Sequence, residues 1–216
     1  MEKNNYEKNY HLNKHNFLYE NPLYYDVKAV ISLIDYFKGI KINSKVLEYG
    51  CGLGQNIYLI KNSVGYDVSK FAVDFCVNRR GINAVRNKKK LRNKFFDIVL
   101  SCEVLEHLEN PKRALEEIKS KLKKGGKLIL ILPIDKWNKP NLKDVNQHLY
   151  NWNFNTITNL LIRVGFYPVE FKIIRRTGFK KLLPISEINL SFYLFLTKII
   201  AIFTGSKHMK IIAVKK

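Results

Sequence analysis

The chain has 216 residues, and its 38 lysines and arginines against 18 aspartates and glutamates give a formal charge of +20. Hydrophobic residues make up 46% of the sequence, enough for one substantial core, which excludes a disordered or low-complexity chain. Most of the cations are lysines spread along the whole sequence. Net charge bears on association rather than fold, so nucleic acid and anionic membranes stay open as partners without being favoured.

Apolar runs and helical periodicities alternate from residue 23 onward. The elements expected in the first half are a helix over 23–37, a strand over 45–49, a brief helix over 55–61, a strand over 64–67, a helix over 69–78 and a strand over 82–85. Those expected in the second half are a strand over 95–101, a helix from 111 to the glycine pair at 125–126, a strand over 128–132, a helix over 157–164, a strand over 167–174, an apolar insertion over 177–205 and a strand over 210–214. Strands without a polar side, alternating with helices, predict a parallel sheet covered on both faces.

Residues 1–21 lack this periodicity and predict a polar, loosely docked arm ahead of a single domain over 22–216. The first residues contain no apolar segment, so no secretory signal is expected. The three cysteines, Cys51, Cys76 and Cys102, are odd in number and lack C-x-x-C spacing. They argue against a disulfide framework or structural zinc and favour a reducing cytoplasm.

The strongest chemical signal is the sequence Glu48-Tyr-Gly50-Cys51-Gly52-Leu-Gly54, which follows the first apolar strand. Glycines between a strand and a helix let backbone N–H groups approach a ligand closely. The last glycine comes one position too early for the dinucleotide pattern G-x-G-x-x-G. A carboxylate inside a buried strand, Glu48, indicates a ligand that carries a cationic or amino group.

Asp67 ends the second strand, where a doubly wound fold places the carboxylate that binds ribose hydroxyls. A nucleoside with a charged amino-acid tail therefore fits this pattern better than a pyrophosphate. Four segments in order, VLEYGCGLGQN, VGYDVS, FDIVLSCEVLEHLENPKRALEEI and LKKGGKLILILP, resemble the class I S-adenosylmethionine-dependent methyltransferases. The resemblance covers about residues 45–174 and the final strand at 208–214.

The resemblance implies a Rossmann-like, doubly wound α/β sheet of seven strands, mostly parallel with the last antiparallel, and a helical insertion before that strand. It implies S-adenosyl-L-methionine as cofactor, with the methionine part near Glu48 and the glycine turn and the ribose at Asp67. The full set of implied cofactor-binding residues is Glu48, Gly50, Cys51, Gly52, Gly54, Asp67, Val68, Asn87, Ser101 and Cys102. Asn87 stands in this set for the aspartate that such enzymes often place near the adenine.

Candidate catalytic residues follow the fourth strand and the fifth. His107 is a candidate general base, Glu103 shares its helical face at i and i+4, and His148 lies on the same side of the sheet. A metal held by Glu103, Glu106 and His107 is the weaker interpretation, and no metal is expected. Cys51 and Cys102 lack the setting of a nucleophilic cysteine and are interpreted as small buried residues.

The chain is therefore predicted to be a cytoplasmic enzyme that methylates an oxygen of a small or lipid-like acceptor. This prediction follows the ubiquinone-type O-methyltransferases, which the segment EVLEHL of this chain resembles. Two alternatives stay open: an RNA or protein methyltransferase that uses the basic residues of 79–94, and a non-catalytic cofactor-binding protein. Nucleic acid is disfavoured because that run lacks interleaved aromatic residues. The apolar stretch INLSFYLFLTKIIAIF, about sixteen residues with Lys198 inside, is too short and too interrupted to predict a membrane span. Residues 185–205 could instead cover the acceptor or lie on a lipid surface.

Overall fold

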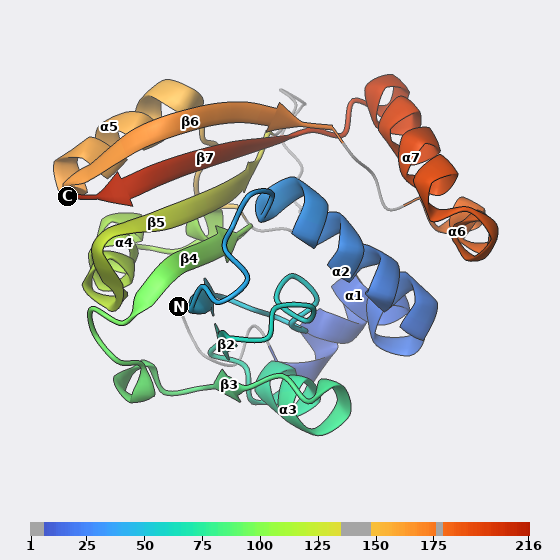
Figure 1. Cartoon of the computed structure of the whole chain (residues 1–216), viewed down its shortest axis with the longest axis horizontal. Coiled ribbons are helices and arrows are strands. Elements are labelled where there is room, and N and C mark those ends of the chain that lie inside the picture. The colour runs from blue at the N-terminus through green and yellow to red at the C-terminus, as the bar shows by residue number, and fades with distance from the viewer. Residues whose placement is uncertain (1–6, 135–147, 176–178) are drawn as a thin grey trace.

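The computed structural model describes residues 7–134, 148–175 and 179–216 and contains one seven-stranded sheet in the order β3-β2-β1-β4-β5-β7-β6 (Figure 1). The strands are β1 (Val46–Tyr49), β2 (Ser63–Tyr66), β3 (Ala84–Val85), β4 (Phe96–Cys102), β5 (Leu122–Pro133), β6 (Phe166–Ile174) and β7 (His208–Lys215). Strands β1 to β5 pair in parallel, while β7 runs antiparallel to both β5 and β6. The predicted mostly parallel sheet with an antiparallel last strand is confirmed.

The apolar strands bury both faces because alternate side chains point to opposite sides of a sheet. In β5, Leu128 and Leu130 join a core cluster with helices α4 (Pro111–Lys121) and α5 (Phe154–Val164). Ile129 and Ile131 belong to a second cluster on the opposite face, with residues of α3 (Lys70–Arg80) and the end of α2 (Pro22–Tyr36). A strand with a polar side could not stand at this position.

Residues that favour helix ends stand at the helix boundaries. The Ser69 side chain accepts a hydrogen bond from the N–H of Ala72 at 3.1 Å, and that of Asn110 accepts one from Arg113 at 2.9 Å. Gly81 ends α3 in the left-handed conformation, with φ at +63°. These caps satisfy the backbone groups that a helix end leaves without an intrahelical partner.

Two predicted elements differ from the structure. Residues 55–61 form turns rather than a brief helix. Helix α4 ends at Lys121, and the glycine pair lies inside β5, which begins at Leu122 opposite Phe96. A register shift in the β4–β5 pairing accommodates the pair, and a Cβ on Gly126 would come within 3.0 Å of the Lys123 carbonyl oxygen.

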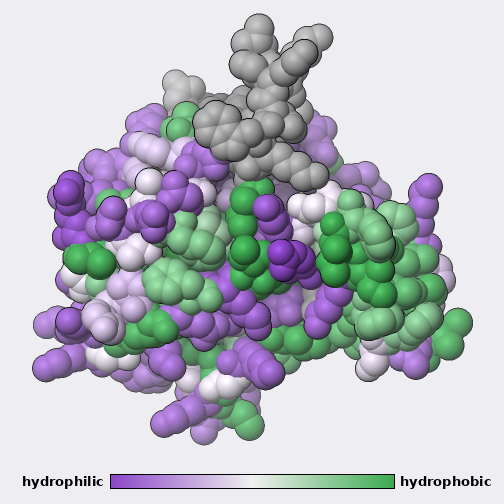
Figure 2. Space-filling view, turned by 90° about the horizontal axis from the view of Figure 1, so that it is seen from above, coloured by the Kyte–Doolittle hydropathy of each residue, from purple (hydrophilic) through white to green (hydrophobic). Residues whose placement is uncertain are grey.

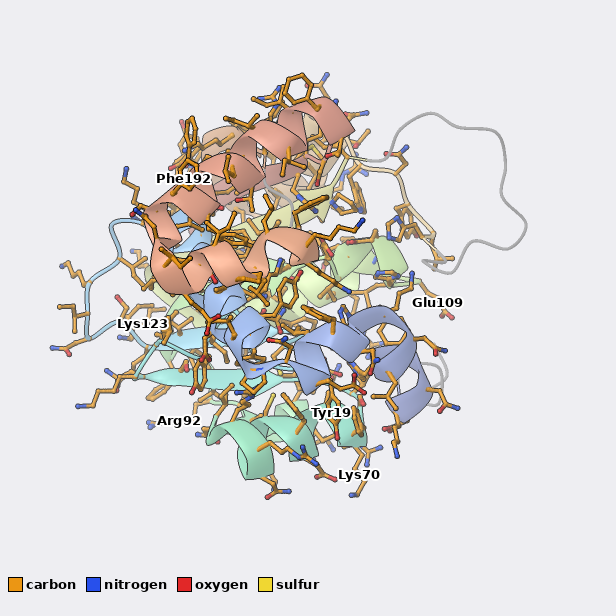
Figure 3. All side chains as sticks on the ribbon, turned by 90° about the vertical axis from the view of Figure 1, so that its right-hand side faces the viewer. Tyr19, Lys70, Arg92, Glu109, Lys123 and Phe192 are labelled. Carbon is orange, nitrogen blue, oxygen red and sulfur yellow. The ribbon has the colours of Figure 1, made fainter. Side chains whose placement is uncertain are left out.

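The region predicted as a loose arm instead forms helix α1 (Lys8–Glu20), which packs on α3 (Figure 3). The Tyr19 ring lies 5.6 Å from that of Phe71 and 5.2 Å from that of Phe75. Glu7 precedes α1 and accepts hydrogen bonds from the N–H groups of Lys70 and Phe71, both at 3.1 Å. The correction is physical: aromatic contacts and a carboxylate at the N-terminus of α3 fix a segment whose own sequence is polar. The division into an arm and a domain over 22–216 stays a prediction.

The apolar insertion forms a short turn, η4 (Lys180–Leu182), and helices α6 (Leu183–Ile188) and α7 (Leu190–Thr204). Figure 1 shows α6 and α7 beside the sheet, leading into β7. Leu183 and Tyr193 pack in one cluster with Tyr25 and Ile31 of α2, so the insertion extends the layer that α1 and α2 form. Among the described residues, none of the helices has the length and apolarity needed to cross a bilayer.

The glycine turn after β1 lies against the segment after β4. Gly50 has φ at +82°, and its N–H donates to the Tyr66 carbonyl at 2.8 Å. A Cβ at Gly50 would stand 2.4 Å from Cγ2 of Val104, a contact that real side chains do not make. Both the positive φ and the close approach therefore require glycine.

We predict that Glu7→Gln lowers the free energy of unfolding by about 0.5–1 kcal/mol at pH 7, the range for an anion at a helix N-terminus. Burial opposes ionisation of Glu7, but hydrogen bonds from Phe71, Lys70 and Ser69 outweigh it and lower the pKa below its usual 4.5. The difference between wild type and variant should be complete above pH 4.5 and vanish as the pH falls through the lowered pKa. Urea denaturation from pH 3 to pH 7 measures it, and a pH-independent difference would contradict it.

Gly50→Ala should destabilise the protein by about 1–3 kcal/mol more than Gly39→Ala. Gly39 also has a positive φ, at +79°, but a Cβ there meets nothing within 4 Å. Both substitutions carry the backbone strain, so their difference isolates the collision with Val104. Equal losses of stability in thermal unfolding would contradict this prediction. They would mean that the turn at Gly50 and the segment with Val104 can move apart without a loss of free energy.

Candidate functional site

The main cavity, of about 330 Å³, opens at the carboxyl ends of the parallel strands β1, β2 and β4. Its walls are formed by helix α1, by the glycine turn after β1, by the segments that follow β2 and β4, and by His148. A crevice outside the carboxyl ends of the strands is the usual ligand site of an open α/β sheet. The lining residues used below are Gly50, Cys51, Gly52, Gln55, Asn56, Asp67, Val68, Cys102, Glu103, His107 and His148.

Asp67 connects the turn after β1 with the turn after β2. One carboxylate oxygen accepts the N–H of Gly52 at 2.8 Å and the other accepts the N–H of Ser69 at 2.9 Å. Burial raises the pKa of Asp67, and the hydrogen bonds from Ser69 and Gly52 oppose that rise. The carboxylate is thereby held at the cavity wall, with its acceptor capacity available to a ligand hydroxyl.

Glu48 lies beneath the glycine turn and outside the cavity lining. Its side chain is fully buried, and Oε1 accepts a hydrogen bond from Nδ2 of Asn56 at 2.6 Å. Oε2 has no hydrogen-bond partner among the described residues. Burial raises the pKa of Glu48 to about 8, because no cation offsets the loss of solvent. Glu48 therefore acts on the cavity through Asn56, which lines it.

The segment after β4 carries the candidate catalytic residues. The carbonyl of Glu106 accepts hydrogen bonds from the N–H groups of Leu149 and Tyr150, at 2.8 and 3.3 Å. These bonds hold the end of the connection after β5 beside η3 (Leu105–His107). The rings of His107 and His148 consequently meet edge to face, with their centroids 4.9 Å apart. The sequence placed both histidines on the binding side, and the structure brings them together at the cavity.

Glu106, His107 and His148 also form a set that could hold a divalent cation. One ligand atom from each lies within 4.8 Å of the others, and the Glu106 side chain is fully buried. A carboxylate with two imidazoles suits several divalent transition metals. The weaker interpretation of the sequence, a metal held by Glu103, Glu106 and His107, names a different set, because Glu103 pairs with His208 instead.

Glu103 has a left-handed backbone, with φ at +54°, which turns its side chain toward β7. Its Oε1 lies 2.7 Å from Nε2 of His208. Desolvation opposes ionisation of Glu103, but the hydrogen bond and attraction from His208 outweigh it and lower the pKa. Glu103 lines the cavity, yet it pairs with β7 rather than sharing a face with His107.

Four residues of the predicted cofactor set lie outside the lining: Glu48, Gly54, Ser101 and Asn87. Gly54 serves packing, since a Cβ there would stand 2.6 Å from Cδ1 of Ile82. The Asn87 side chain accepts the N–H of Lys89 at 2.9 Å and caps a short turn, so the structure does not bring it to the cavity. The remaining six residues of that set line it.

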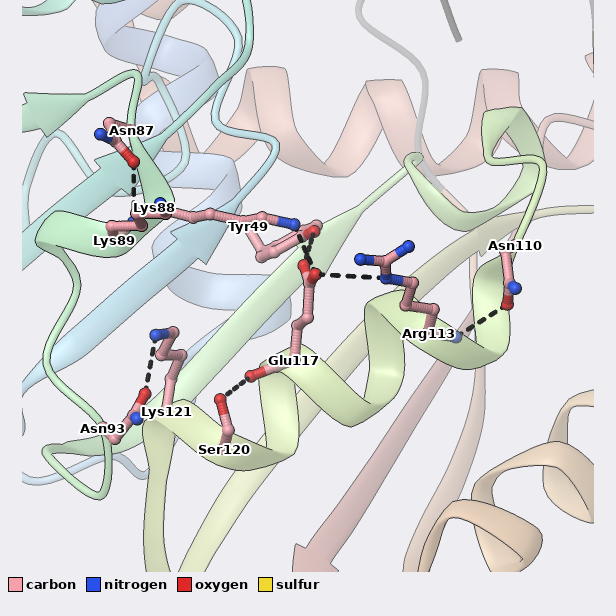
Figure 4. Close-up of polar contacts among 10 residues, drawn as sticks. All are labelled: Tyr49, Asn87, Lys88, Lys89, Asn93, Asn110, Arg113, Glu117, Ser120 and Lys121. Carbon is pink, nitrogen blue, oxygen red and sulfur yellow. Dashed lines mark hydrogen bonds and ion pairs between the residues drawn. The ribbon is translucent and has the colours of Figure 1, made fainter.

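The basic run around Asn87 is used within the fold (Figure 4). Lys88 forms an ion pair with Glu117 of α4, whose carboxylate also accepts the hydroxyl of Tyr49 at 3.0 Å. Arg80 lies 3.8 Å from the centroid of the Tyr25 ring. The Nε–H of Arg86 donates to the carbonyl of Val68 at 3.0 Å. These contacts tie the run to neighbouring elements.

Helix α1 is the wall that sequence reasoning missed. It contributes Tyr10, His11, Lys14, His15 and Leu18 to the cavity. The signal was the spacing of His11, His15 and Leu18, which repeats at four and three residues as a helical face does, although its members are mostly polar. Burial, followed by the charge of His11, lowers the pKa of His15 to about 4.

Gln55 is a second lining residue that sequence reasoning missed. It bears on whether the cavity fits S-adenosylmethionine. Its buried Oε1 lines the cavity and has no hydrogen-bond partner among the described residues. An amino-acid tail needs such acceptors, and ribose hydroxyls need an acceptor such as the Asp67 carboxylate. At the turn, Gly52 has no side chain between its backbone and His11, whose Cε1 is 4.0 Å from where a Cβ on Gly52 would stand. These residues fit the group.

The cysteines at the cavity are protonated thiols. The hydrogen bond with Cys76, together with burial, raises the pKa of Cys51, and burial raises that of Cys102. A thiolate is the nucleophilic form of cysteine. Their interpretation as buried residues without a covalent role agrees with this environment.

Comparison with known proteins agrees with this geometry. The family model described as a methyltransferase domain matches residues 24–170. The chain is 37% identical over 87 residues to the uncharacterised protein MJ1123 of Methanocaldococcus jannaschii, covering 39% of this chain and 42% of that protein. It is 31% identical over 128 residues to MJ1252 of the same organism, covering 57% of this chain and 49% of that protein. Each match thus spans less than half of the curated relative.

Two solved structures share the fold. One is a SAM-dependent methyltransferase from Archaeoglobus fulgidus, with a TM-score of 0.57, 24% identity, and coverage of 94% of this chain and 100% of that chain. The other is a SAM-dependent methyltransferase from Thermotoga maritima described as a possible histamine N-methyltransferase, with a TM-score of 0.62, 20% identity, and coverage of 80% of this chain and 87% of that chain. The chain therefore belongs to the methyltransferase domain family, and its fold is that of the S-adenosylmethionine-dependent methyltransferases.

Proposed function

We propose that the chain transfers the methyl group of S-adenosylmethionine to an oxygen atom of a small or lipid-like acceptor. The observation that carries the choice of oxygen is the pair His107 and His148, which meet at the cavity with rings 4.9 Å apart. A hydroxyl acceptor must lose its proton as it is methylated, and an imidazole is suited to take it near neutral pH. The proposed balance is one new O–CH₃ bond, one broken S–CH₃ bond, and one proton moved to imidazole nitrogen.

The residues of the chain would bind the cofactor and orient the acceptor toward it. Asp67 would accept hydrogen bonds from the ribose hydroxyls, and Gln55 would accept one from the amino group of the methionine part. Gly50 and Gly52 line the cavity, and without side chains they would let that part approach the backbone of the turn. When bound, the cofactor supplies a methyl group already activated on a sulfonium. Orienting the acceptor in line with it can supply roughly 7–11 kcal/mol of the barrier reduction.

Helix α1 would exclude water from this site. Leu18 is buried, and His11 comes within 4.0 Å of where a Cβ on Gly52 would stand. The side chains of α1 thus cover the glycine turn from the solvent side. Exclusion of water strengthens the electrostatic interactions inside a cavity.

Three alternatives are an RNA acceptor, a nitrogen atom as the acceptor, and a non-catalytic cofactor-binding protein. The contacts of Lys88, Arg80 and Arg86 within the fold weaken the case for an RNA groove on the basic run. Nitrogen stays open as the acceptor atom, since the T. maritima neighbour is described as a possible N-methyltransferase. A non-catalytic cofactor-binding protein would keep the cavity without turnover.

The lipid-like version of the acceptor rests on α7. Phe195 and Phe203 expose 57% and 85% of their surface, and Figure 2 shows an apolar area on the side of the molecule where α6 and α7 lie. Arg175 and Lys181, beside the insertion, are exposed and could contact anionic headgroups, while Arg176 lies outside the described residues. We propose peripheral contact with an anionic lipid surface through 185–205.

The state of Glu48 gives a pH test of the cavity floor. Its pKa is about 8 in the fold against a usual 4.5, so unfolding releases a proton between those values and stability must fall as the pH rises. In the ligand-free protein, Glu48→Gln should therefore gain stability relative to wild type from pH 5 to pH 8. Chemical denaturation measures this, with the exposed Glu187→Gln as control. Parallel profiles for wild type and Glu48→Gln would contradict it.

The proposed reaction is tested with labelled S-adenosylmethionine and fractionated cell extract. Label should enter an ether or ester of a small molecule or lipid, and His107→Gln and His148→Gln should each lower turnover 10²–10⁴-fold, the usual range for a general base, without weakening cofactor binding. Unchanged turnover in both variants would contradict the role of His107 and His148 as general bases. Label in RNA or protein would overturn the acceptor class, and loss of activity with EDTA would assign the histidines to a cation instead.

Membrane contact is tested by flotation with vesicles of phosphatidylcholine alone or mixed with phosphatidylserine. Wild type should float with the anionic vesicles, and Phe195→Ser with Phe203→Ser should reduce the bound fraction severalfold, because each buried aromatic side chain contributes about 1.5–3 kcal/mol. The exposed Tyr167→Ser on β6 is the matched control. Equal flotation of the double variant would remove α7 from the interaction.

A further inference from the structure

A second cavity, of about 170 Å³, adjoins the first. Cys102 and Glu103 at the end of β4 line both, as do His15 and Gln55. A cavity of about 150 Å³ holds a benzene ring. The second cavity therefore has room for a small ring or a headgroup placed next to the proposed cofactor site.

Lysines from three separate elements line this cavity: Lys14 from α1, Lys28 from α2 and Lys180 from η4. Among the described residues, neither Lys28 nor Lys180 forms an ion pair. The Lys180 ammonium lies 4.7 Å from the centroid of the Phe17 ring, which places it at the rim. Charges that converge from α1, α2 and η4 depend on tertiary packing, because no short stretch of sequence contains them.

Glu103 is the acid among the described lining residues of this cavity. Its Oε1 already pairs with Nε2 of His208 at 2.7 Å. It attracts Lys28 only from beyond ion-pair distance, since no such pair forms. Lys28 and Lys180, which form no ion pair among the described residues, outnumber this one engaged glutamate, so the cavity has an excess of positive charge.

His15 also lines this cavity, and the positive charges around it affect its pKa. Burial is the largest cause of its lowered pKa, and the charges of Lys28 and Lys14 add to it. The imidazole is therefore neutral at pH 7, and the positive charge of the cavity resides on the lysines. Ammonium groups in one partly buried site repel each other unless an anion lies between them.

We propose that this second cavity binds the anionic end, a carboxylate or a phosphate, of the methyl acceptor, between the ammonium groups of Lys14, Lys28 and Lys180. The assignment rests on the proposed methyl transfer to a small or lipid-like acceptor and narrows it to acceptors that carry an oxyanion. An acceptor anchored there reaches the first cavity past Cys102 and Glu103. Lysines suit this task because a flexible ammonium accommodates either oxyanion.

The test measures binding to the whole chain saturated with S-adenosylhomocysteine, by calorimetry. The probes are inorganic phosphate, benzoate, and benzyl alcohol as the uncharged match to benzoate. Wild type should bind phosphate, and benzoate at least tenfold more tightly than benzyl alcohol. Lys28→Ala should weaken both anions about tenfold, Lys28→Arg should retain them, and Lys180→Ala should cost less because Lys180 is at the exposed rim. Lys181→Ala, the exposed neighbour outside the cavity, should change nothing.

Three results would overturn the proposal: no preference for benzoate over benzyl alcohol, anion binding unchanged in Lys28→Ala, or a specific loss of cofactor. In the last case Lys28→Ala would weaken S-adenosylhomocysteine but not 5′-methylthioadenosine, so the lysines would hold the cofactor's own carboxylate. Thermal unfolding checks that each variant is folded. Failure of this proposal would appear in the calorimetry, which needs no turnover. Failure of the proposed function would appear in the labelling experiment, as label in RNA or protein. The two failures are therefore distinguishable.

Discussion

The close approach of Gly50 to Val104 is the constraint on which the site depends. The turn after β1 and the segment after β4 can touch only because no Cβ stands between them, where one would come within 2.4 Å of a methyl group. Parallel pairing of β1 with β4 brings both segments to the same edge of the sheet. The cavity is the space above this contact, so a ligand there meets the glycine turn and the candidate catalytic residues at once.

The floor and the roof of the cavity are held by different forces. Beneath the turn, Glu48 is fully buried and holds Asn56, so the floor is a polar pair inside an apolar core. Above the turn, α1 is held by aromatic contacts and by Glu7 at the N-terminus of α3. Burial raises the pKa of the Glu48 carboxyl to about 8, so the group beneath the floor is protonated at pH 7 in the ligand-free protein.

The charge of +20 has separate structural uses. In the basic run, Lys88 pairs with Glu117, and Arg80 lies over an aromatic ring. At the second cavity, Lys28 and Lys180 lack an acidic partner among the described residues. Net charge could not distinguish these cases, because the same residue type stabilises the fold in one place and faces a cavity in the other.

The sequence by itself determined the mostly parallel sheet, the helix caps at Ser69 and Asn110, and the placement of the glycine turn and Asp67 at one edge, while the antiparallel last strand was implied only by the resemblance to methyltransferases. These follow from periodicity and from turn chemistry, which act over a few residues. The tertiary structure alone decided the role of residues 8–20, because aromatic packing against α3 orders a polar segment that local propensity leaves undecided. It also decided that Asn87 caps a turn, that His107 meets His148, and that lysines of α1, α2 and η4 share one cavity. The packing of residues 8–20, the meeting of the two histidines and the grouping of the lysines depend on residues far apart in the chain, whose distances are fixed by packing and by no local pattern.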